Sequence, residues 1–113
     1  MRALLMDDAT APLYTVGQVA RMLEVQPAFL RRLDTFGVVS PARSEGGQRR
    51  YSREHVERVA EACTLIGEGL TLSGVLRVFA LQTEVAALRA ELAAERARIT
   101  PPASDNQGVL AHS

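Results

Sequence analysis

Apolar residues recur at helical spacing near the start of this sequence. Four of them fall at positions i, i+3, i+4 and i+7: Val16, Val19, Ala20 and Leu23. The pattern predicts a helix over Val16–Leu23 whose apolar stripe faces a core. Thr15 suits the N-cap position before it, because its hydroxyl can accept a backbone N–H of the first turn.

A second helix is predicted over Pro27–Asp34, after a short break in the pattern. Pro27 fits a first helical turn, where no N–H is needed, and Gly37 fits the left-handed residue that follows a helix. Leu30 and Leu33 are the expected buried positions. Two helices separated by so short a turn are typical of a helix–turn–helix unit.

The segment Val39–Tyr51 predicts a hairpin folded about Gly46-Gly47. Ser52 then caps a third helix that ends at Gly67, and Thr71 caps a short fourth helix. The expected apolar positions of the third helix are Val56, Val59, Ala60 and Cys63. Those of the fourth helix are Leu72, Val75, Leu76 and Phe79.

From Leu81 onward the spacing becomes that of a coiled coil. Alternating steps of four and three residues connect Leu81, Val85, Leu88, Leu92, Glu95 and Ile99. A helix over residues 82–99, about 27 Å long, is marginal alone in water, and the small domain before it cannot bury so narrow a stripe. We therefore expect the five apolar members to form a homodimer interface.

Charge is distributed unevenly along the 113 residues. All 13 basic residues are arginine, and 13 acidic residues make the whole chain formally neutral. The segment Pro27–Arg53, however, has six arginines and two acids, a local charge of +4. A compact basic unit with a short turn between two helices suits the DNA major groove, where arginine can pair with phosphates and guanines.

Several function classes lack support. Cys63 is the single cysteine, so no intramolecular disulfide forms, and we expect a buried hydrophobic residue there. No set of His, Cys, Asp and Glu has ligand spacing, and nothing resembles a catalytic nucleophile with its base. We therefore expect no metal, no cofactor and no enzymatic activity.

The ends of the chain and its hydropathy suggest a cytoplasmic protein. No apolar run of about 18 residues would span a membrane, and residues 1–6 are too short for a signal peptide. Only 14 residues follow Ile99. That is too little to build a ligand pocket, so no small-molecule ligand is expected.

Four motifs follow one another along the first half of the chain. They are Tyr14-Thr15-Val16-Gly17-Gln18-Val19-Ala20, Leu30-Arg31 with Asp34, Gly37-Val38-Val39-Ser40-Pro41, and Gly47-Gln48-Arg49-Arg50-Tyr51-Ser52. Their order and spacing resemble the MerR family of bacterial transcription regulators, and the resemblance extends to about Ile99. Gln26-Pro27 before the second helix is more similar to the heat-shock repressor (HspR) branch than to the metal sensors.

The resemblance implies a mainly α fold, in which a winged helix–turn–helix domain is followed by a helix pair and a C-terminal dimerisation helix. The expected parts are a flexible N-terminal arm (residues 1–13), the winged helix–turn–helix domain with its helix pair (14–80), a dimerisation coiled coil (81–99) and a disordered tail (100–113). The coiled-coil residues expected at the dimer interface are Leu81, Val85, Leu88, Leu92 and Ile99.

The resemblance also implies where DNA would bind. Arg31 matches the family's phosphate-binding arginine of the second helix, and Arg49 and Arg50 match its wing arginines. Tyr51 matches the tyrosine that follows, although we expect it mainly to pack the wing onto the core. The full expected DNA-binding set is Thr15, Gln26, Ala28, Arg31, Arg32, Arg43, Gln48, Arg49, Arg50 and Tyr51.

Two positions depart from the family pattern. Arg32-Leu33 stands where the family usually has aromatic residues, so that a phenol near the DNA backbone is replaced by a cation or lost. Gln26 stands where a small cap residue is usual, and it either reads an adenine edge or caps the helix. Base preference therefore cannot be carried across.

The favoured function is a homodimeric regulator that binds double-stranded DNA at a palindromic operator. RNA polymerase or a regulatory protein is compatible with that function as a further partner. One alternative is a DNA-bending factor similar to the excisionases, which the helix pair and coiled coil argue against. Another is a protein-binding adaptor that uses the basic face and the coiled coil.

Overall fold

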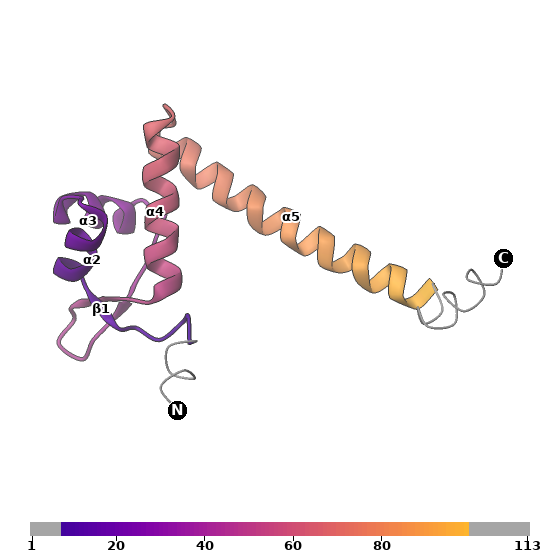
Figure 1. Cartoon of the computed structure of the whole chain (residues 1–113), viewed down its shortest axis with the longest axis horizontal. Coiled ribbons are helices and arrows are strands. Elements are labelled where there is room, and N and C mark those ends of the chain that lie inside the picture. Colours follow the sequence, from indigo (N-terminus) through magenta and orange to yellow (C-terminus); the bar gives the residue numbers. More distant parts are fainter. Residues whose placement is uncertain (1–7, 100–113) are drawn as a thin grey trace, which may run out of the picture. The chain divides into compact units, whose positions relative to one another are not determined.

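The computed structural model of the chain describes residues 8–99, which form helices and one small sheet (Figure 1). The elements in chain order are β1 (Tyr14–Thr15), α2 (Val16–Leu23), α3 (Pro27–Thr35), β2 (Ala42–Arg43), β3 (Arg49–Tyr51), α4 (Arg53–Gly67) and α5 (Leu72–Ile99). The chain divides into two compact units between Arg77 and Val78, within α5. The predicted class, a mainly helical winged helix–turn–helix fold, is confirmed.

Helix α2 begins at the predicted cap. The Thr15 hydroxyl accepts a hydrogen bond from the backbone N of Gln18 at 3.1 Å, and the Gln18 side-chain oxygen accepts one from the backbone N of Thr15 at 2.8 Å. This reciprocal pair is a capping box, which satisfies two backbone donors at once. The helix ends at Leu23, and the C-cap residue Glu24 has a left-handed φ of 56°.

Helix α3 follows the local signals read from the sequence and runs one residue further than predicted. Pro27 occupies its first turn, and Leu30 and Leu33 are buried. Gly37 adopts a φ of +76°, and the N–H of Val38 bonds to the carbonyl of Leu33 at 2.8 Å. This bond closes the helix end, an arrangement that commonly accompanies a left-handed glycine after a helix.

The sheet has β3 at its centre, paired antiparallel with β1 on one side and with β2 on the other. Strand β1 places Thr15 opposite Arg50, and β2 places Arg43 opposite Arg49. The hydrophobic pattern did not predict β1, because two residues are too few to show an alternation. This strand ties the start of α2 directly to the hairpin.

One aliphatic core holds the first unit together. Its completely or almost completely buried large side chains include Val19, Leu30, Leu33, Tyr51, Val59 and Val75. They come from α2, α3, β3, α4 and the start of α5. The hairpin is therefore fixed to the helices through Tyr51 at the end of β3.

Helix α4 is capped by Ser52 and His55. The backbone N of Ser52 donates to Nδ1 of His55 at 3.0 Å, and the backbone N of His55 donates to the Ser52 hydroxyl at 3.0 Å. This reciprocal pair is a second capping box, formed like the one at Thr15.

The buried face of α4 differs slightly from the prediction. Val56, Val59 and Ala62 are buried, whereas Cys63 is only half-buried. The phase shifts because the small side chains at 60, 62 and 63 carry too little apolar bulk to distinguish i+3 from i+4 spacing. Burial still raises the pKa of the Cys63 thiol, which keeps it in the weakly reactive protonated form.

Residues 8–13, part of the flexible arm predicted over residues 1–13, form hydrogen bonds with the end of β3 and the start of α4. The N–H of Leu13 bonds to the carbonyl of Tyr51, and the N–H of Glu54 bonds to the carbonyl of Ala9. The Asp8 carboxylate accepts from the hydroxyl and the backbone N of Thr10, and these bonds lower the pKa of Asp8. Such local turns carry no periodic signal; residues 1–7 lie outside the described residues.

Helix α5 is continuous from Leu72 to Ile99, where the sequence suggested a short helix followed by a separate coiled-coil helix. The residues around the expected boundary, Ala80-Leu81-Gln82, all favour helix, so nothing there stops it. Val75 and Phe79 are buried as predicted, whereas Leu76 is exposed. The disorder expected for residues 100–113 concerns a segment outside the described residues.

Candidate nucleic-acid interface

Two arginines lie on opposite sides of the exposed face of α3. Successive residues turn by about 100° around a helix. Ala28 and Thr35 therefore lie opposite the buried Leu30 and Leu33, and both are exposed. Arg31 lies on the flank of α3 that also carries Asp34, whereas Arg32 lies on the other flank.

The Arg32 side of α3 adjoins an apolar hollow within the first unit. The hollow has a volume of about 450 Å³ and is lined by Phe29, Arg32, Phe36, Ile66, Leu70, Thr71, Leu72 and Ser73. Phe36 is half exposed there. Arg32 is thus placed beside aromatic and aliphatic side chains, apart from the other arginines of the expected DNA-binding set.

The hairpin from Ala42 to Tyr51 forms the wing. Its tip is closed by backbone bonds from Ser44 to Gln48 and from Gly47 to Ser44, at 2.7 and 2.9 Å. Gly47 has a φ of +84°, a conformation that residues with a side chain rarely adopt. Gln48 is exposed beside this turn, and its backbone N donates to the Ser44 hydroxyl.

A second hollow lies between the wing and the N-terminus of α2. Its volume is about 450 Å³, and its lining is Thr15, Val16, Gly17, Gly47, Gln48, Arg49 and Arg50. The sheet brings these segments together, since Thr15 is directly opposite Arg50. A helix N-terminus carries a partial positive charge and backbone N–H groups, so this hollow combines two arginines with a surface that favours anions.

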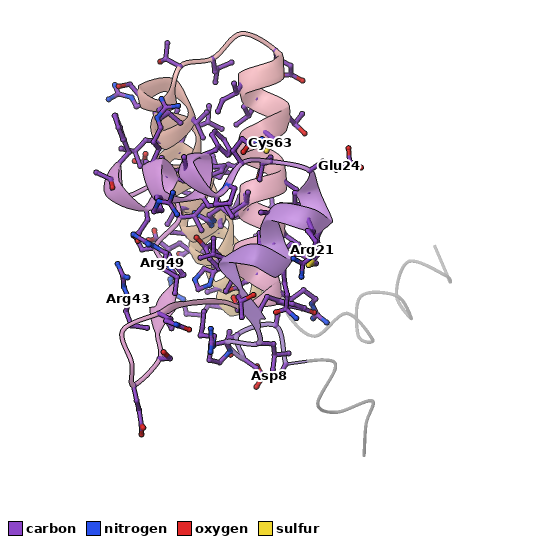
Figure 2. The ribbon with its side chains drawn as sticks, turned by 90° about the vertical axis from the view of Figure 1, so that its left-hand side faces the viewer. Asp8, Arg21, Glu24, Arg43, Arg49 and Cys63 are labelled. Carbon is purple, nitrogen blue, oxygen red and sulfur yellow. The ribbon has the colours of Figure 1, made fainter. Side chains whose placement is uncertain are left out.

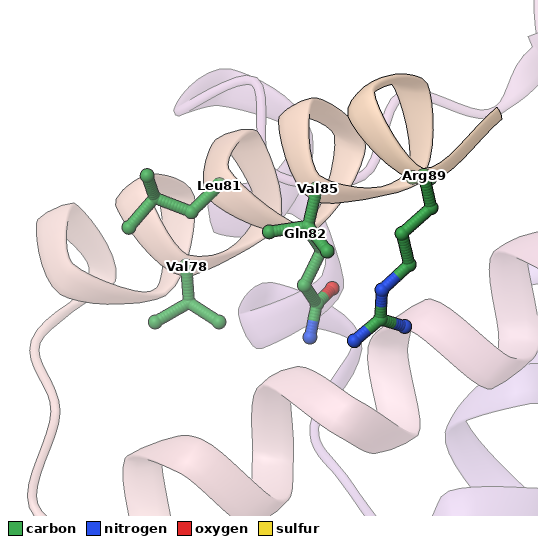
Figure 3. A pocket seen from close by; sticks show the side chains of 6 residues that line it. Val78, Leu81, Gln82, Val85 and Arg89 are labelled. Carbon is green, nitrogen blue, oxygen red and sulfur yellow. The ribbon is translucent and has the colours of Figure 1, made fainter. Parts of the chain in front are cut away.

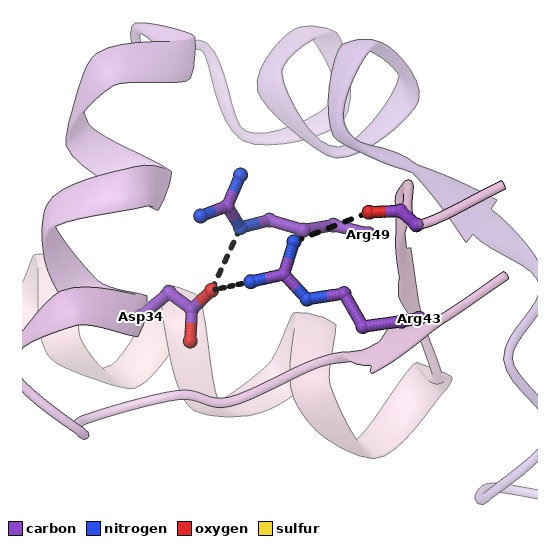
Figure 4. A network of polar contacts seen from close by, with 4 residues as sticks. Asp34, Arg43 and Arg49 are labelled. Atoms are coloured by element: carbon purple, nitrogen blue, oxygen red, sulfur yellow. Dashed lines mark hydrogen bonds and ion pairs between the residues drawn. The ribbon is translucent and has the colours of Figure 1, made fainter.

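Asp34 joins the wing to α3 (Figure 4). Its Oδ2 accepts from Nε of Arg49 at 2.7 Å and from Nη2 of Arg43 at 3.2 Å. Arg43 also donates from Nη1 to the carbonyl of Gly47 at 3.3 Å. Figure 2 shows Arg43 and Arg49 close together beside the wing.

The sequence does not predict the contacts of Asp34. The pattern shows this residue only as an acid within a basic segment and as part of a motif, and neither observation reveals its partners. The available signal was an acid on the same flank of the second helix as Arg31, followed by a hairpin with arginines in both strands. A bridge across 15 positions of sequence cannot be read from local pattern alone.

The polar side chains at the start of α3 remain at the surface. Gln26 is the N-cap residue, yet its side chain makes no capping hydrogen bond, so the reading of Gln26 as a cap gains no support. Its amide is exposed, as is the methyl group of Ala28. Both side chains are available to a ligand that approaches the N-terminal end of α3.

Tyr51 occupies the core. Its side chain is 1% exposed, and its hydroxyl has no hydrogen-bond partner among the described residues. Burial raises the pKa of the phenol. This placement agrees with the expectation that Tyr51 packs the wing, and it leaves a direct phosphate contact without an exposed hydroxyl to make it.

Tyr51→Phe is expected to raise the free energy of unfolding at neutral pH by about 1 kcal/mol, because it removes a buried hydroxyl without a partner. In the wild type the raised pKa of Tyr51 makes its neutral phenol contribute to folding stability. This contribution is fully present below about pH 10, the pKa of the unfolded chain, and is lost as pH rises through the pKa of the folded chain. Denaturant unfolding from pH 7 to 11 should show this loss of stability in the wild type. The variant should lack the part of the loss that comes from residue 51, because phenylalanine does not titrate. Tyr14→Phe is the control, and a tenfold loss of duplex DNA affinity in Tyr51→Phe would contradict the structural role.

The expected dimer residues form an exposed stripe on α5. Their exposed fractions run from 43% for Val85 to 71% for Ile99, with Leu81, Leu88 and Leu92 between. A hollow of about 370 Å³ lies along the same helix and is lined by Val78, Leu81, Gln82, Val85, Ala86 and Arg89 (Figure 3). The stripe is therefore apolar and accessible within its own unit.

Over residues 8–99, no three His, Cys, Asp or Glu side chains are grouped as a metal site would require. The helices of the same range include none with the length and hydrophobicity needed to cross a membrane.

Comparison with protein families finds a match that covers most of the described chain. Residues 14–82 match the model described as MerR HTH family regulatory protein. The chain is 34% identical over 74 residues to the putative heat shock protein HspR of Streptomyces coelicolor, covering 65% of this chain and 49% of that protein. It is 28% identical over 76 residues to the regulator GlnR of Bacillus anthracis, covering 67% of this chain and 59% of that protein.

Solved structures agree on the fold. A MerR-family transcriptional regulator from Bacillus cereus superposes with a TM-score of 0.56 at 20% identity, covering 88% of this chain and 75% of that one. HiNmlR, a MerR family regulator lacking the sensor domain and bound to promoter DNA, gives 0.52 at 23% identity, covering 73% and 76%. The chain thus spans about half to three fifths of HspR and GlnR, and about three quarters of these two structures.

Proposed function

Because this chain belongs to the MerR family of helix–turn–helix regulatory proteins and is thus a DNA-binding transcriptional regulator rather than an enzyme, we propose that it works as a homodimer on a palindromic operator. Each subunit would bind one half-site with α3 in the major groove and the wing beside it. The expectation of a DNA-binding regulator is met at the level of the family. The dimer, the operator symmetry and the residues in contact are the proposal.

The hollow between the wing and α2 is the observation that carries this proposal. Arg49, Arg50 and the capped N-terminus of α2 surround it. A DNA phosphate is the anion best suited to such a place, because the backbone N–H groups and the arginines stabilise its charge together. Phosphates that bind there would fix the orientation of α3 on the duplex.

We assign the remaining contacts by their position on α3 and the wing. Arg31 lies on the flank of α3 that carries Asp34, which faces the wing, and would bind a phosphate beside the groove. Gln26 and Ala28 are exposed at the N-terminal end of α3 and would face base edges. An amide suits adenine, and a methyl group suits the methyl of thymine.

The other members of the expected set have more limited parts. Thr15 and Gln48 line the hollow and would add hydrogen bonds to the same phosphate. Arg43 acts mainly through Asp34, and Arg32 would contact phosphate at the far side of α3. Tyr51 would support the wing from the core.

The homodimer is proposed from the stripe on α5. Leu81, Val85, Leu88 and Leu92 recur at coiled-coil spacing and remain exposed. A second copy of the same helix would bury this stripe, since identical helices offer complementary apolar seams. Two subunits related by a two-fold axis would then read two half-sites of inverted sequence.

Selection of bound sites from random duplex DNA by the purified chain tests the function. We expect recovered sites to contain an inverted repeat, and the affinity for the best site to fall steeply with salt. A slope near zero would contradict phosphate-based recognition. Recovery of no enriched sequence, with binding that depends instead on an acidic protein, would favour the adaptor alternative.

A further inference from the structure

One carboxylate controls how the wing arginines are presented. Asp34 is 15% exposed in its side chain, and its Oδ2 accepts from both Arg49 and Arg43. Arg49 is 21% exposed, and its contact is the shorter of the two, at 2.7 Å. The stronger and better shielded half of this network is therefore the Asp34–Arg49 pair, because charge-assisted bonds away from solvent are the least screened.

The atom through which Arg49 is held determines what it offers. Asp34 engages Nε, the nitrogen nearest the aliphatic stem. In Figure 4 the dashed contact from Asp34 meets Arg49 at Nε, and no dashed line reaches either of its terminal nitrogens. A guanidinium anchored in this way keeps its two terminal NH₂ groups for another acceptor and holds its plane in one orientation.

We propose that Asp34 is a positioning residue for DNA recognition, which holds Arg49 by Nε so that its terminal nitrogens face a phosphate at a fixed place relative to α3. This inference rests on the proposed function and deepens it. Preorganisation reduces the ordering cost of binding, and it favours the one duplex geometry that matches the held arginine. Asp34 also offsets one positive charge of the wing, which weakens attraction to DNA of any sequence.

The two effects of Asp34 predict opposite changes on removing its charge. In Asp34→Asn, affinity for the selected operator should fall, because Arg49 loses its fixed orientation. Affinity for unrelated duplex DNA should rise, because two arginines lose their carboxylate partner. The ratio of operator to non-operator affinity should therefore drop about tenfold or more, the scale of one charge-assisted hydrogen bond.

The test measures that ratio by competition binding for the full chain and for Asp34→Asn, Asp34→Glu and Arg49→Lys. Asp34→Glu should largely restore the ratio, since it returns the carboxylate. Arg49→Lys should lower it despite an unchanged charge, because an ammonium has no Nε anchor with separate terminal donors. This variant keeps the proposal testable if Asp34→Asn folds poorly by circular dichroism.

A double-mutant cycle separates positioning from simple support of the fold. In an Arg49→Ala background, Asp34→Asn should change the ratio by less than about twofold, since the residue it positions is gone. A parallel fall of both affinities together with the melting temperature, or a full effect in the Arg49→Ala background, would overturn the inference. Absence of duplex binding by the wild type would instead overturn the proposed function.

Discussion

Leu88→Asp combined with Leu92→Asp is expected to give a monomer whose operator affinity is lower by about 100-fold or more. Both leucines are about half exposed in the single chain, so the change opens no cavity in its core. In a dimer seam they would be buried, and four carboxylates there would cost far more than the interface gains. Loss of the second subunit removes the effective concentration that links two half-sites, which accounts for the size of the effect.

Light scattering and fluorescence anisotropy on a labelled operator measure the two parts of this prediction. Ala90→Asp with Ala94→Asp is the matched control, because it adds the same charge to an exposed part of α5 away from the stripe. That control should remain dimeric and bind normally. A wild-type chain that scatters as a monomer at about 10 µM would contradict the proposal, because specific operators are bound far more tightly than that.

Removal of the phosphate contacts should weaken operator binding and flatten its salt dependence. Arg31→Ala is expected to lower affinity about tenfold or more, and Arg49→Ala with Arg50→Ala more strongly. Each lost phosphate contact reduces the slope of log affinity against log salt by about 0.9, and a homodimer loses every contact twice. Arg31 is exposed and the wing arginines lie outside the core, so the fold should persist.

Affinity measured from 50 to 300 mM salt, roughly the range in which such slopes are resolved, checks this prediction. Arg77→Ala is the charge-matched control, since Arg77 is an exposed arginine on α5 outside the predicted set. Equal losses for Arg77→Ala and Arg31→Ala would mean that net charge alone sets affinity. Unchanged salt slopes in both test variants would contradict the assignment of phosphate contacts to Arg31, Arg49 and Arg50.

Local chemistry explains why much of the fold was predictable from the sequence. Thr15 and Ser52 as caps, Pro27 in a first turn and Gly37 after a helix each act within a few residues of their partners. The family motifs then supplied the order of the elements. Signals of this range survive in the sequence because they do not depend on how distant segments pack.

The parts that could not be predicted depend on contacts between distant segments. Thr15 lies opposite Arg50, and Asp34 reaches Arg49, only after the hairpin has folded against the helices. The apolar hollow beside Arg32 forms for the same reason, because Ile66 and Leu70 reach it from a distant part of the chain. The phase of α4 was missed where small residues left the periodicity ambiguous.

The small size of the outer strands has a consequence for solubility. With β3 at the centre, the sheet ends in β1 on one side and β2 on the other, and each of these has only two residues. A long, flat, apolar edge would offer unpaired backbone groups to the edge of another sheet and lead to aggregation. Here the β2 edge is brief and carries the charged Arg43, so open-ended stacking of strands between copies is disfavoured at this edge.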